Sequence, residues 1–276
     1  MNPMLGLVEG SPERQAIDAG EIDAVVDYST SKVVLLPAAR RALRELAGEA
    51  SIANHLLAAL PAAEYQSLLP RLEPLTVKFG EVLEEQGVPV RYIYFPIDCM
   101  ISLLTTAEHD RALEVGLVGY EGVVGTSLVL GAEISSVRAV VQAGGTALRM
   151  KGTSFVEAFR QCLPLQRVLL RYAHEELVQA RTTAACKLFH AVEARLARRL
   201  LMTSDRLRSL EFVLTQALVA KMLGVRRATV NEAAGLLQQR RLIDYCRGKV
   251  TILDRKGLEA ASCRCYATMN ELQMSQ

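Results

Sequence analysis

The side chains best suited to specific recognition lie between positions 226 and 232. Arginine, threonine, asparagine and glutamate occur there within two helical turns, as Arg226, Arg227, Thr229, Asn231 and Glu232. A guanidinium can donate two parallel hydrogen bonds to the edge of guanine, and a hydroxyl can bind a phosphate oxygen. This set of residue types therefore indicates contact with a nucleic acid.

Two amphipathic segments within residues 214–241 would position these side chains. Apolar residues recur at helical spacing on both sides of Gly224. Gly224 can take the left-handed conformation that a tight turn between two helices needs. Thr215 can cap the first helix, and Arg226 can open the second. The pattern predicts a helix-turn-helix whose second helix could enter a major groove; the alternative is an ordinary helical hairpin with solvated arginines.

Residues 242–253 favour the first interpretation. Two short strand-like runs flank Arg247–Gly248–Lys249, which predicts a hairpin with a basic tip and so a winged helix. The region resembles the Crp/Fnr family of transcription regulators. The resemblance rests on Leu214–Thr215, Met222–Leu–Gly–Val225, Arg227–Ala–Thr–Val230 and Leu242–Ile243.

The resemblance implies a set of DNA contacts. Arg227 takes the place of the arginine that reads guanine in the family. Ala228 stands where many members have glutamate and Glu232 where some have arginine, which predicts an altered half-site. The expected contacts are Thr215, Gln216, Arg226, Arg227, Ala228, Thr229, Asn231, Glu232, Arg247 and Lys249.

Residues 74–150 have the sequence pattern of a β-sheet, because short β-rich runs alternate with glycine breaks. The predicted strands are Val77–Phe79, Val82–Leu83, Tyr92–Phe95, Met100–Thr105, Val115–Val118, Ala139–Gln142 and Ala147–Met150. With the winged helix downstream, this region resembles the double-stranded β-roll of the cyclic-nucleotide-binding superfamily. Short amphipathic helices are expected before it, at 51–73.

The ligand pocket of the expected β-roll departs from the family. Cyclic-AMP binders hold the phosphate with a Gly–Glu pair and a later arginine followed by serine or threonine. Here Gly125 precedes Thr126, and the later position falls within Ser135–Arg138. Cyclic AMP is therefore disfavoured, and the candidate effector residues are Gly125, Thr126, Ser136 and Arg138.

The sequence gives little indication of any other cofactor. The family's iron–sulfur sensors carry an N-terminal cysteine cluster, whereas the first cysteine here is Cys99, so no iron–sulfur cluster is expected. Cys99 and His109 are only weak candidates for haem ligands. Cys186 and His190 lie four positions apart but make an incomplete metal site, so they are interpreted as packing residues. The lone pair Cys263–Arg–Cys265 is poor evidence for a metal, and no metal is predicted. The absence of a P-loop, a nucleophile motif and convincing paired carboxylates argues against an enzyme and leaves no catalytic residue to name.

A long helix is expected after Pro164, within a helical region at 153–204. It resembles the family's dimerisation helix, which implies a two-fold homodimer; the alternative is a single buried core helix. The expected interface residues are Leu165, Val168, Leu169, Tyr172, Leu177, Ala180 and Ala184. Residues 191–206 should form the first helix of the DNA-binding domain, with Arg195, Arg198 and Arg199 facing outward and a break at Thr203–Arg206.

The N-terminal 50 residues are less informative. Ile22–Val26 and Lys32–Leu36 predict two short strands, and Pro37–Ala47 predicts a helix. The segment could be an appendage that packs on the sensor domain or a mobile leader.

The whole chain has 276 residues and a net charge of +2, with acidic residues concentrated before residue 150 and basic residues after it. This asymmetry indicates nucleic-acid contact from one end. Without a membrane span or signal sequence, the expected location is cytoplasmic. The expected fold is α+β: an appendage (1–50), a jelly-roll-like sensor β-roll (51–153), a dimerisation helix (154–189), a winged helix-turn-helix (190–260) and a tail (261–276).

The expected partners are double-stranded DNA and a second copy of the chain, with RNA polymerase added if the protein is an activator, and no membrane. A protein-interaction module with secondary DNA binding is the alternative function.

Overall fold

The computed structural model describes residues 24–27, 32–35, 54–106 and 112–274. Contacts divide the chain into two compact units, residues 1–50 and residues 51–276. None of the helices in the described ranges is long and apolar enough to cross a membrane.

The first unit contains a small antiparallel pair of strands. β1 (Ala24–Asp27) pairs with β2 (Lys32–Leu35), and Val25 lies opposite Val34. The two short strands predicted here are confirmed. The helix predicted over 37–47 lies outside the described residues.

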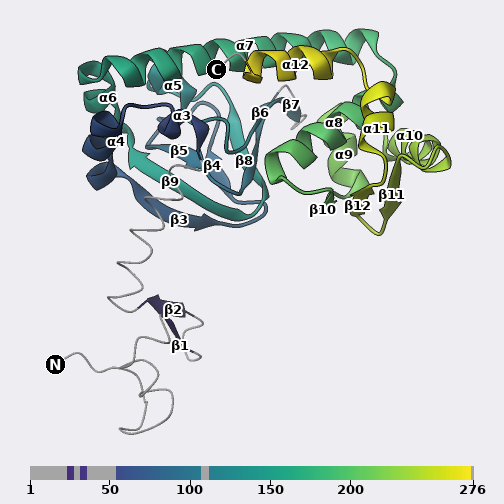
Figure 1. Ribbon diagram of the computed structural model, residues 1–276, viewed down its shortest axis with the longest axis horizontal. Coiled ribbons are helices and arrows are strands. Elements are labelled where there is room, and N and C mark those ends of the chain that lie inside the picture. Colours follow the sequence, from purple (N-terminus) through teal and green to yellow (C-terminus); the bar gives the residue numbers. More distant parts are fainter. Residues whose placement is uncertain (1–23, 28–31, 36–53, 107–111, 275–276) are drawn as a thin grey trace, which may run out of the picture. The chain divides into compact units, whose positions relative to one another are not determined.

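The second unit opens with two short helices and a β-roll (Figure 1). The helices are α3 (His55–Ala58) and α4 (Ala62–Leu68), and the turn η1 (Leu69–Arg71) follows them. The strands are β3 (Glu73–Val77), β4 (Val82–Glu84), β5 (Tyr92–Pro96), β6 (Met100–Thr106), β7 (Ala112–Val118), β8 (Arg138–Ala143) and β9 (Gly145–Lys151).

These strands form two antiparallel sheets, in the orders β3-β9-β5 and β4-β8-β6-β7. Apolar side chains such as Ile93, Ile101 and Val141 are fully buried between them. The predicted β-roll is therefore confirmed. The first strand was misplaced: β3 ends at Val77, and Phe79 is 67% exposed, because Gly80 turns the chain with φ 81°.

Three helices follow or interrupt the roll: α5 (Thr126–Val129), α6 (Gly152–Gln161) and α7 (Leu163–Phe189). Pro164 lies in the first turn of α7, as expected, and the sulfur of Cys162 accepts a hydrogen bond from the Leu165 amide at 3.4 Å. The long helix contacts α5 and β7 of the roll (Figure 1). Gly122 is required beneath it, because a Cβ there would clash with the hydroxyl of Tyr172.

The remaining elements form a winged helix-turn-helix around one apolar core, which confirms the predicted α+β architecture. Leu196, Val219, Val230 and Val250 are all fully buried in this core. The elements are α8 (Val192–Leu207), β10 (Glu211–Val213), α9 (Gln216–Leu223), α10 (Arg227–Gln239), β11 (Ile243–Cys246), β12 (Lys249–Ile252) and α11 (Arg255–Ala261).

Three local features differ from the sequence-based expectations. The predicted break at 203–206 is wrong, because α8 continues to Leu207 and the Thr203 hydroxyl donates to the Arg199 carbonyl at 2.9 Å. The wing has a third strand, β10, in the order β10-β12-β11. The tail contains α12 (Cys265–Met274), which packs against α7 and α8 (Figure 1).

Candidate nucleic-acid interface

The turn between α9 and α10 is fixed by its own sequence. The Thr215 hydroxyl accepts a hydrogen bond from the Leu218 amide at 3.3 Å and so caps α9. Gly224 ends α9 with φ 66°, a left-handed conformation that costs glycine little. Arg226 occupies the N-cap position of α10. The predicted turn and caps are confirmed, and they direct the first turn of α10 away from the core.

The wing returns close to this helix start. Arg247 and Gly248 have φ of 49° and 82°, which is the pattern of a two-residue hairpin turn that follows the strand twist. The Gly248 carbonyl accepts a hydrogen bond from the Leu214 amide at 2.7 Å. Lys249 forms an ion pair with Glu211 at 2.6 Å in which both side chains are exposed. The basic tip is therefore held beside the start of α9.

A surface hollow of about 450 Å³ lies between the two helices and the wing. Thr215, Gln216, Arg227 and Arg247 line it together with Tyr245. Gln216 donates to the Asn231 side chain at 3.2 Å, so the two helices also present joined polar groups. The structure thus brings together predicted contacts that are separated by up to 32 positions in the chain.

The other expected contacts lie on the same helix. Arg226, Arg227, Ala228, Asn231 and Glu232 are exposed. Thr229 is half-buried. An exposed polar face above a buried apolar face is the arrangement that a recognition helix needs.

A family model, the Crp-like helix-turn-helix domain, matches residues 194–261. The chain carries a Crp-like DNA-binding domain. The match extends from α8 to the end of α11, so it includes the hollow and every predicted DNA contact. No curated protein matches the sequence.

Solved structures show the same fold over more of the chain. A putative Crp/Fnr regulator from Eubacterium rectale is 16% identical and has a TM-score of 0.60, with 75% of this chain and 96% of that chain covered. FixK2 from Bradyrhizobium japonicum is 15% identical with a TM-score of 0.59, and the coverage is 70% and 98%. The c-di-GMP-responsive regulator CLP of Xanthomonas campestris is 17% identical with a TM-score of 0.56, and the coverage is 70% and 99%. The resemblance to Crp/Fnr regulators is confirmed at the level of fold.

The arginines of α8 do not face outward as expected. Arg195, Arg198 and Arg199 retain only 8%, 6% and 4% of their exposure. Arg195 donates to the Leu223 carbonyl at the end of α9, and Arg198 donates to the Thr183 hydroxyl at 3.0 Å. Arg198 and Arg199 hold the Crp-like domain against α7 and the roll, whereas Arg195 joins two helices within that domain. The expectation that these three arginines approach phosphate was wrong.

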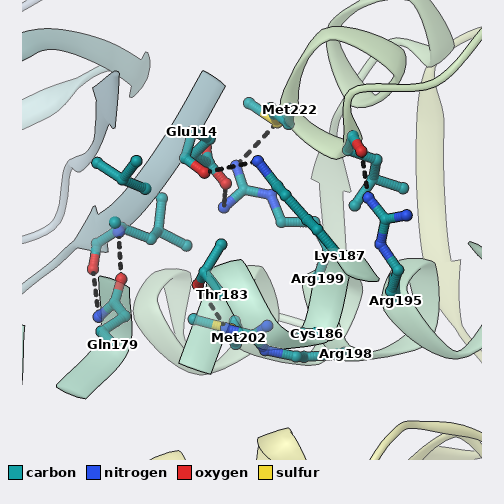
Figure 2. A pocket seen from close by; sticks show the side chains of 14 residues that line it. Glu114, Gln179, Thr183, Cys186, Lys187, Arg195, Arg198, Arg199, Met202 and Met222 are labelled. Carbon is teal, nitrogen blue, oxygen red and sulfur yellow. Dashed lines mark hydrogen bonds and ion pairs between the residues drawn. The ribbon is translucent and has the colours of Figure 1, made fainter. Parts of the chain in front are cut away.

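Two buried ion pairs cross this junction between the roll and the Crp-like domain, and Figure 2 shows the one between Arg199 and Glu114. Arg199 of α8 lies 3.2 Å from Glu114 of β7, with 5% and 12% of the side chains exposed. Arg206 lies 2.8 Å from Glu121, with 4% and 10% exposed. Buried pairs of this kind are costly to break, because the remaining charge keeps no partner.

Helix α7 also forms hydrogen bonds with strand β7 of the roll. The side-chain amide of Gln179 bonds both the N–H and the C=O of Leu117, and the Lys187 ammonium donates to the Glu114 carbonyl at 3.0 Å (Figure 2). The cavity enclosed there is only about 40 Å³, enough for one or two waters and too small for a nucleotide. Strand β7 is therefore joined to the long helix and to the Crp-like domain at once.

The expected effector residues take other partners. The Thr126 hydroxyl donates to Glu176 of α7 at 2.5 Å, and Arg138 pairs with Glu85 at 3.2 Å. Ser136 is exposed, and Gly125, with φ 111°, caps the four-residue helix α5. Because Thr126 and Arg138 already bond carboxylates, these contacts do not support an anion-binding site formed by the four expected effector residues.

Two buried carboxyl groups, Glu84 of β4 and Glu176 of α7, affect each other electrostatically. Burial raises the pKa of Glu84 to about 7, a hydrogen bond from Ser135 partly opposes this, and the charge of Glu176 adds to it. Burial also raises the pKa of Glu176. Burial therefore disfavours the ionised form of both side chains.

This pair predicts a dependence of stability on pH. The folded-state pKa of Glu84 lies above its unfolded value of 4.5, so its unfavourable ionisation is absent below pH 4.5. The free energy of unfolding should fall as the pH rises to about 7, by at most roughly 3 kcal/mol from this group. Glu84→Gln should remove this part of the pH slope, as measured by urea unfolding at a series of pH values.

The exposed residue Glu133 provides the matched control, because Glu133→Gln makes the same chemical change in solvent. An equal loss of slope in both variants would contradict the assignment to Glu84.

The expected dimer residues divide into two groups. Leu165, Leu169 and Tyr172 are buried within the protomer, with 2%, 0% and 5% exposed, so they cannot meet a partner as predicted. Val168 and Ala180 are half-buried. Leu177 is 46% exposed, and Ala184 is exposed. Leu165, Leu169 and Tyr172 are buried because the roll already covers this apolar face of α7.

His55 and Cys99 lie in structural positions away from the interface. His55 stacks edge-on against Tyr120 with ring centroids 4.6 Å apart, and Cys99 is fully buried in the roll. His109 lies outside the described residues.

Proposed function

We propose that this chain is a sequence-specific, DNA-binding transcription regulator of the Crp/Fnr type. The observation that carries the proposal is the convergence of Arg227, Thr215, Gln216 and Arg247 on one hollow between the two helices and the wing. A duplex groove and its phosphates match this combination of a forked donor, hydroxyl, amide and second guanidinium.

In this proposal the start of α10 enters the major groove. Arg227 would read guanine through O6 and N7, and Glu232 would accept from a cytosine amino group. Thr215, Gln216 and Thr229 would bind phosphates and fix the register, and Arg247 at the wing tip would lie beside the backbone. The protein would act in the cytoplasm, and RNA polymerase would be a further partner if the protein activates transcription.

We further propose that the protein acts as a homodimer through the outer face of α7. Leu163, Leu170, Leu177 and Ala184 recur every seven residues on it, and the three leucines are 63%, 49% and 46% exposed. An apolar residue at every seventh position of a long helix supplies one of the two seam positions of a two-stranded coiled coil. A second copy of the same helix is the occupant that this spacing fits, and its two-fold symmetry implies a pseudo-palindromic DNA site.

Leu177→Lys should dissociate the dimer without unfolding the protomer, because position 177 is half-exposed in the single chain. We expect a halved mass by light scattering and loss of cooperative binding to a two-half-site duplex. Leu130→Lys, which changes another exposed leucine of the roll, is the control and should remain dimeric. A dimeric Leu177→Lys protein would contradict this interface.

Control by a ligand of the roll would act through β7. Glu114 and Leu117 of this strand bond α7, and Glu114 also pairs with α8. A shift of the strand would thus bias both the dimer helix and the Crp-like domain between pre-existing arrangements.

The deciding experiment is selection from a randomised duplex library with the purified chain at roughly physiological salt, followed by sequencing. Enrichment of a two-fold-symmetric motif is the expected result. If an intact dimer enriches no motif, with or without added cyclic nucleotides, the proposal fails and a protein-interaction role takes its place.

A further inference from the structure

Four potential metal ligands meet where α7 ends. Cys186 lies in the last turn of α7 and His190 caps the helix, whereas Cys263 and Cys265 flank a residue between α11 and α12. One donor atom from each lies within 4.8 Å of all the others. The chain thus brings together two half-sites that are separated by 73 positions between His190 and Cys263.

We infer that Cys186, His190, Cys263 and Cys265 form a site for one thiophilic divalent metal ion, of which Zn²⁺ is the best fit. Three thiolates and one imidazole are a donor set that zinc takes in closed, structural sites. Soft sulfur ligands exclude magnesium and calcium, which select oxygen. The site would be structural, because four protein ligands complete a tetrahedron and leave no open position.

The spacing between the donors supports a single ion. The sulfurs of Cys186 and Cys263 are 3.4 Å apart, and the Cys265 sulfur is 3.6 Å from Nδ1 of His190. A tetrahedral zinc ion, with bonds of about 2.3 Å to sulfur and about 2.0 Å to nitrogen, separates its donors by roughly 3.5–3.8 Å. An iron–sulfur cluster needs more widely spaced cysteines, because several irons and sulfides lie between them.

The surroundings complement the charge of such a site. Three thiolates and Zn²⁺ carry a net charge of −1. The Arg198 guanidinium interacts electrostatically with all three cysteines. The same arginine bonds Thr183 on α7 and belongs to α8, so it joins the site to the first helix of the Crp-like domain.

The position of the site gives it a mechanical role. All four ligands lie outside the matched residues 194–261, two before them and two after them. Only Ala191 separates His190 from α8, which begins at Val192. A bound ion would therefore join the end of the long helix to the C-terminal segment and restrict the hinge about which the Crp-like domain can turn. This role would act on the proposed DNA-binding function but does not require it.

A disulfide between Cys186 and Cys263 is the competing use of these thiols. A disulfide would use only two of the four side chains and would not explain why His190 and Cys265 lie beside them. Metal binding uses all four, and the thiol protons pass to water as the thiolates bind.

The test uses the untagged full-length chain, purified under reducing conditions after growth with zinc. Elemental analysis should find one zinc per protomer. After the zinc is removed, titration with Co²⁺ should give thiolate-to-cobalt charge transfer and the intense visible bands of tetrahedral coordination, saturating at one equivalent. Cys263→Ser and Cys265→Ser should each weaken cobalt binding at least about tenfold. The control Cys246→Ser, at an exposed cysteine of the wing, should bind as the wild type does.

Three results would overturn the inference: no tetrahedral cobalt spectrum in folded wild-type protein, an equal loss in Cys246→Ser, or the absorption of an iron–sulfur cluster. A Cys186–Cys263 disulfide in protein kept under reducing conditions would also overturn it. Metal stoichiometry and spectra do not depend on DNA, so a failed DNA selection leaves this test intact, and a failed metal titration leaves the DNA-binding proposal intact.

Discussion

Replacing Arg227 with alanine is expected to weaken binding to the selected duplex by roughly 10- to 100-fold, because one bidentate contact to guanine is worth about 1–3 kcal/mol. The side chain is exposed at the start of α10, so the folded protein should be unaffected. Titration of labelled duplex at fixed salt measures the loss, and the thermal midpoint of the variant checks the fold.

Two further variants separate base reading from general attraction to phosphate. Arg240→Ala removes the same charge at the far end of α10, where Arg240 pairs with Glu193 at 2.8 Å, and should change affinity little. Arg227→Lys keeps the charge but loses the forked geometry, so it should relax specificity at one base pair while the salt slope is retained. Equal losses in Arg227→Ala and Arg240→Ala would refute the assigned role of Arg227.

Replacing Glu114 with alanine is expected to destabilise the chain by about 3–5 kcal/mol, because the Arg199 guanidinium would remain buried without its carboxylate. The pair joins β7 to α8, so unfolding should also become less cooperative, with the Crp-like domain and the roll separating into two transitions. Urea unfolding followed by far-UV circular dichroism suits this chain, which contains no tryptophan.

The surface pair of Glu193 with Arg240 is the matched control. Its two side chains are 28% and 51% exposed, so Glu193→Ala should cost less than about 1 kcal/mol. A cost as small for Glu114→Ala would mean that water reaches the junction and that the pair does not couple the two parts.

The helix-turn-helix and its wing could be predicted from local sequence, because local residues determine them. Thr215 caps its own helix, Gly224 supplies a left-handed turn, and Arg247–Gly248 closes a hairpin between adjacent strands. The third wing strand, β10, was missed because three residues, of which only Phe212 is buried, carry too little pattern to be recognised.

The junction and the cysteine–histidine cluster could not be predicted in the same way. Arginine on an amphipathic helix is normally solvated, and only the tertiary fold shows that Arg199 and Arg206 meet Glu114 and Glu121, more than eighty positions earlier. The two halves of the cluster each looked incomplete for the same reason. The sequence also did not indicate which apolar face of α7 the roll covers, because both faces carry apolar residues at helical spacing.

The bond between Gln179 and the backbone of Leu117 has a consequence for solubility. Strand β7 is the last strand of its sheet, and a terminal strand offers unpaired amides and carbonyls to any other extended chain. The Gln179 amide fills one such position as a neighbouring strand would, and Lys187 occupies the carbonyl of Glu114. Helix α7 therefore shields the sheet against edge-to-edge aggregation, and a β-roll severed before this helix would expose an edge on which further copies could polymerise.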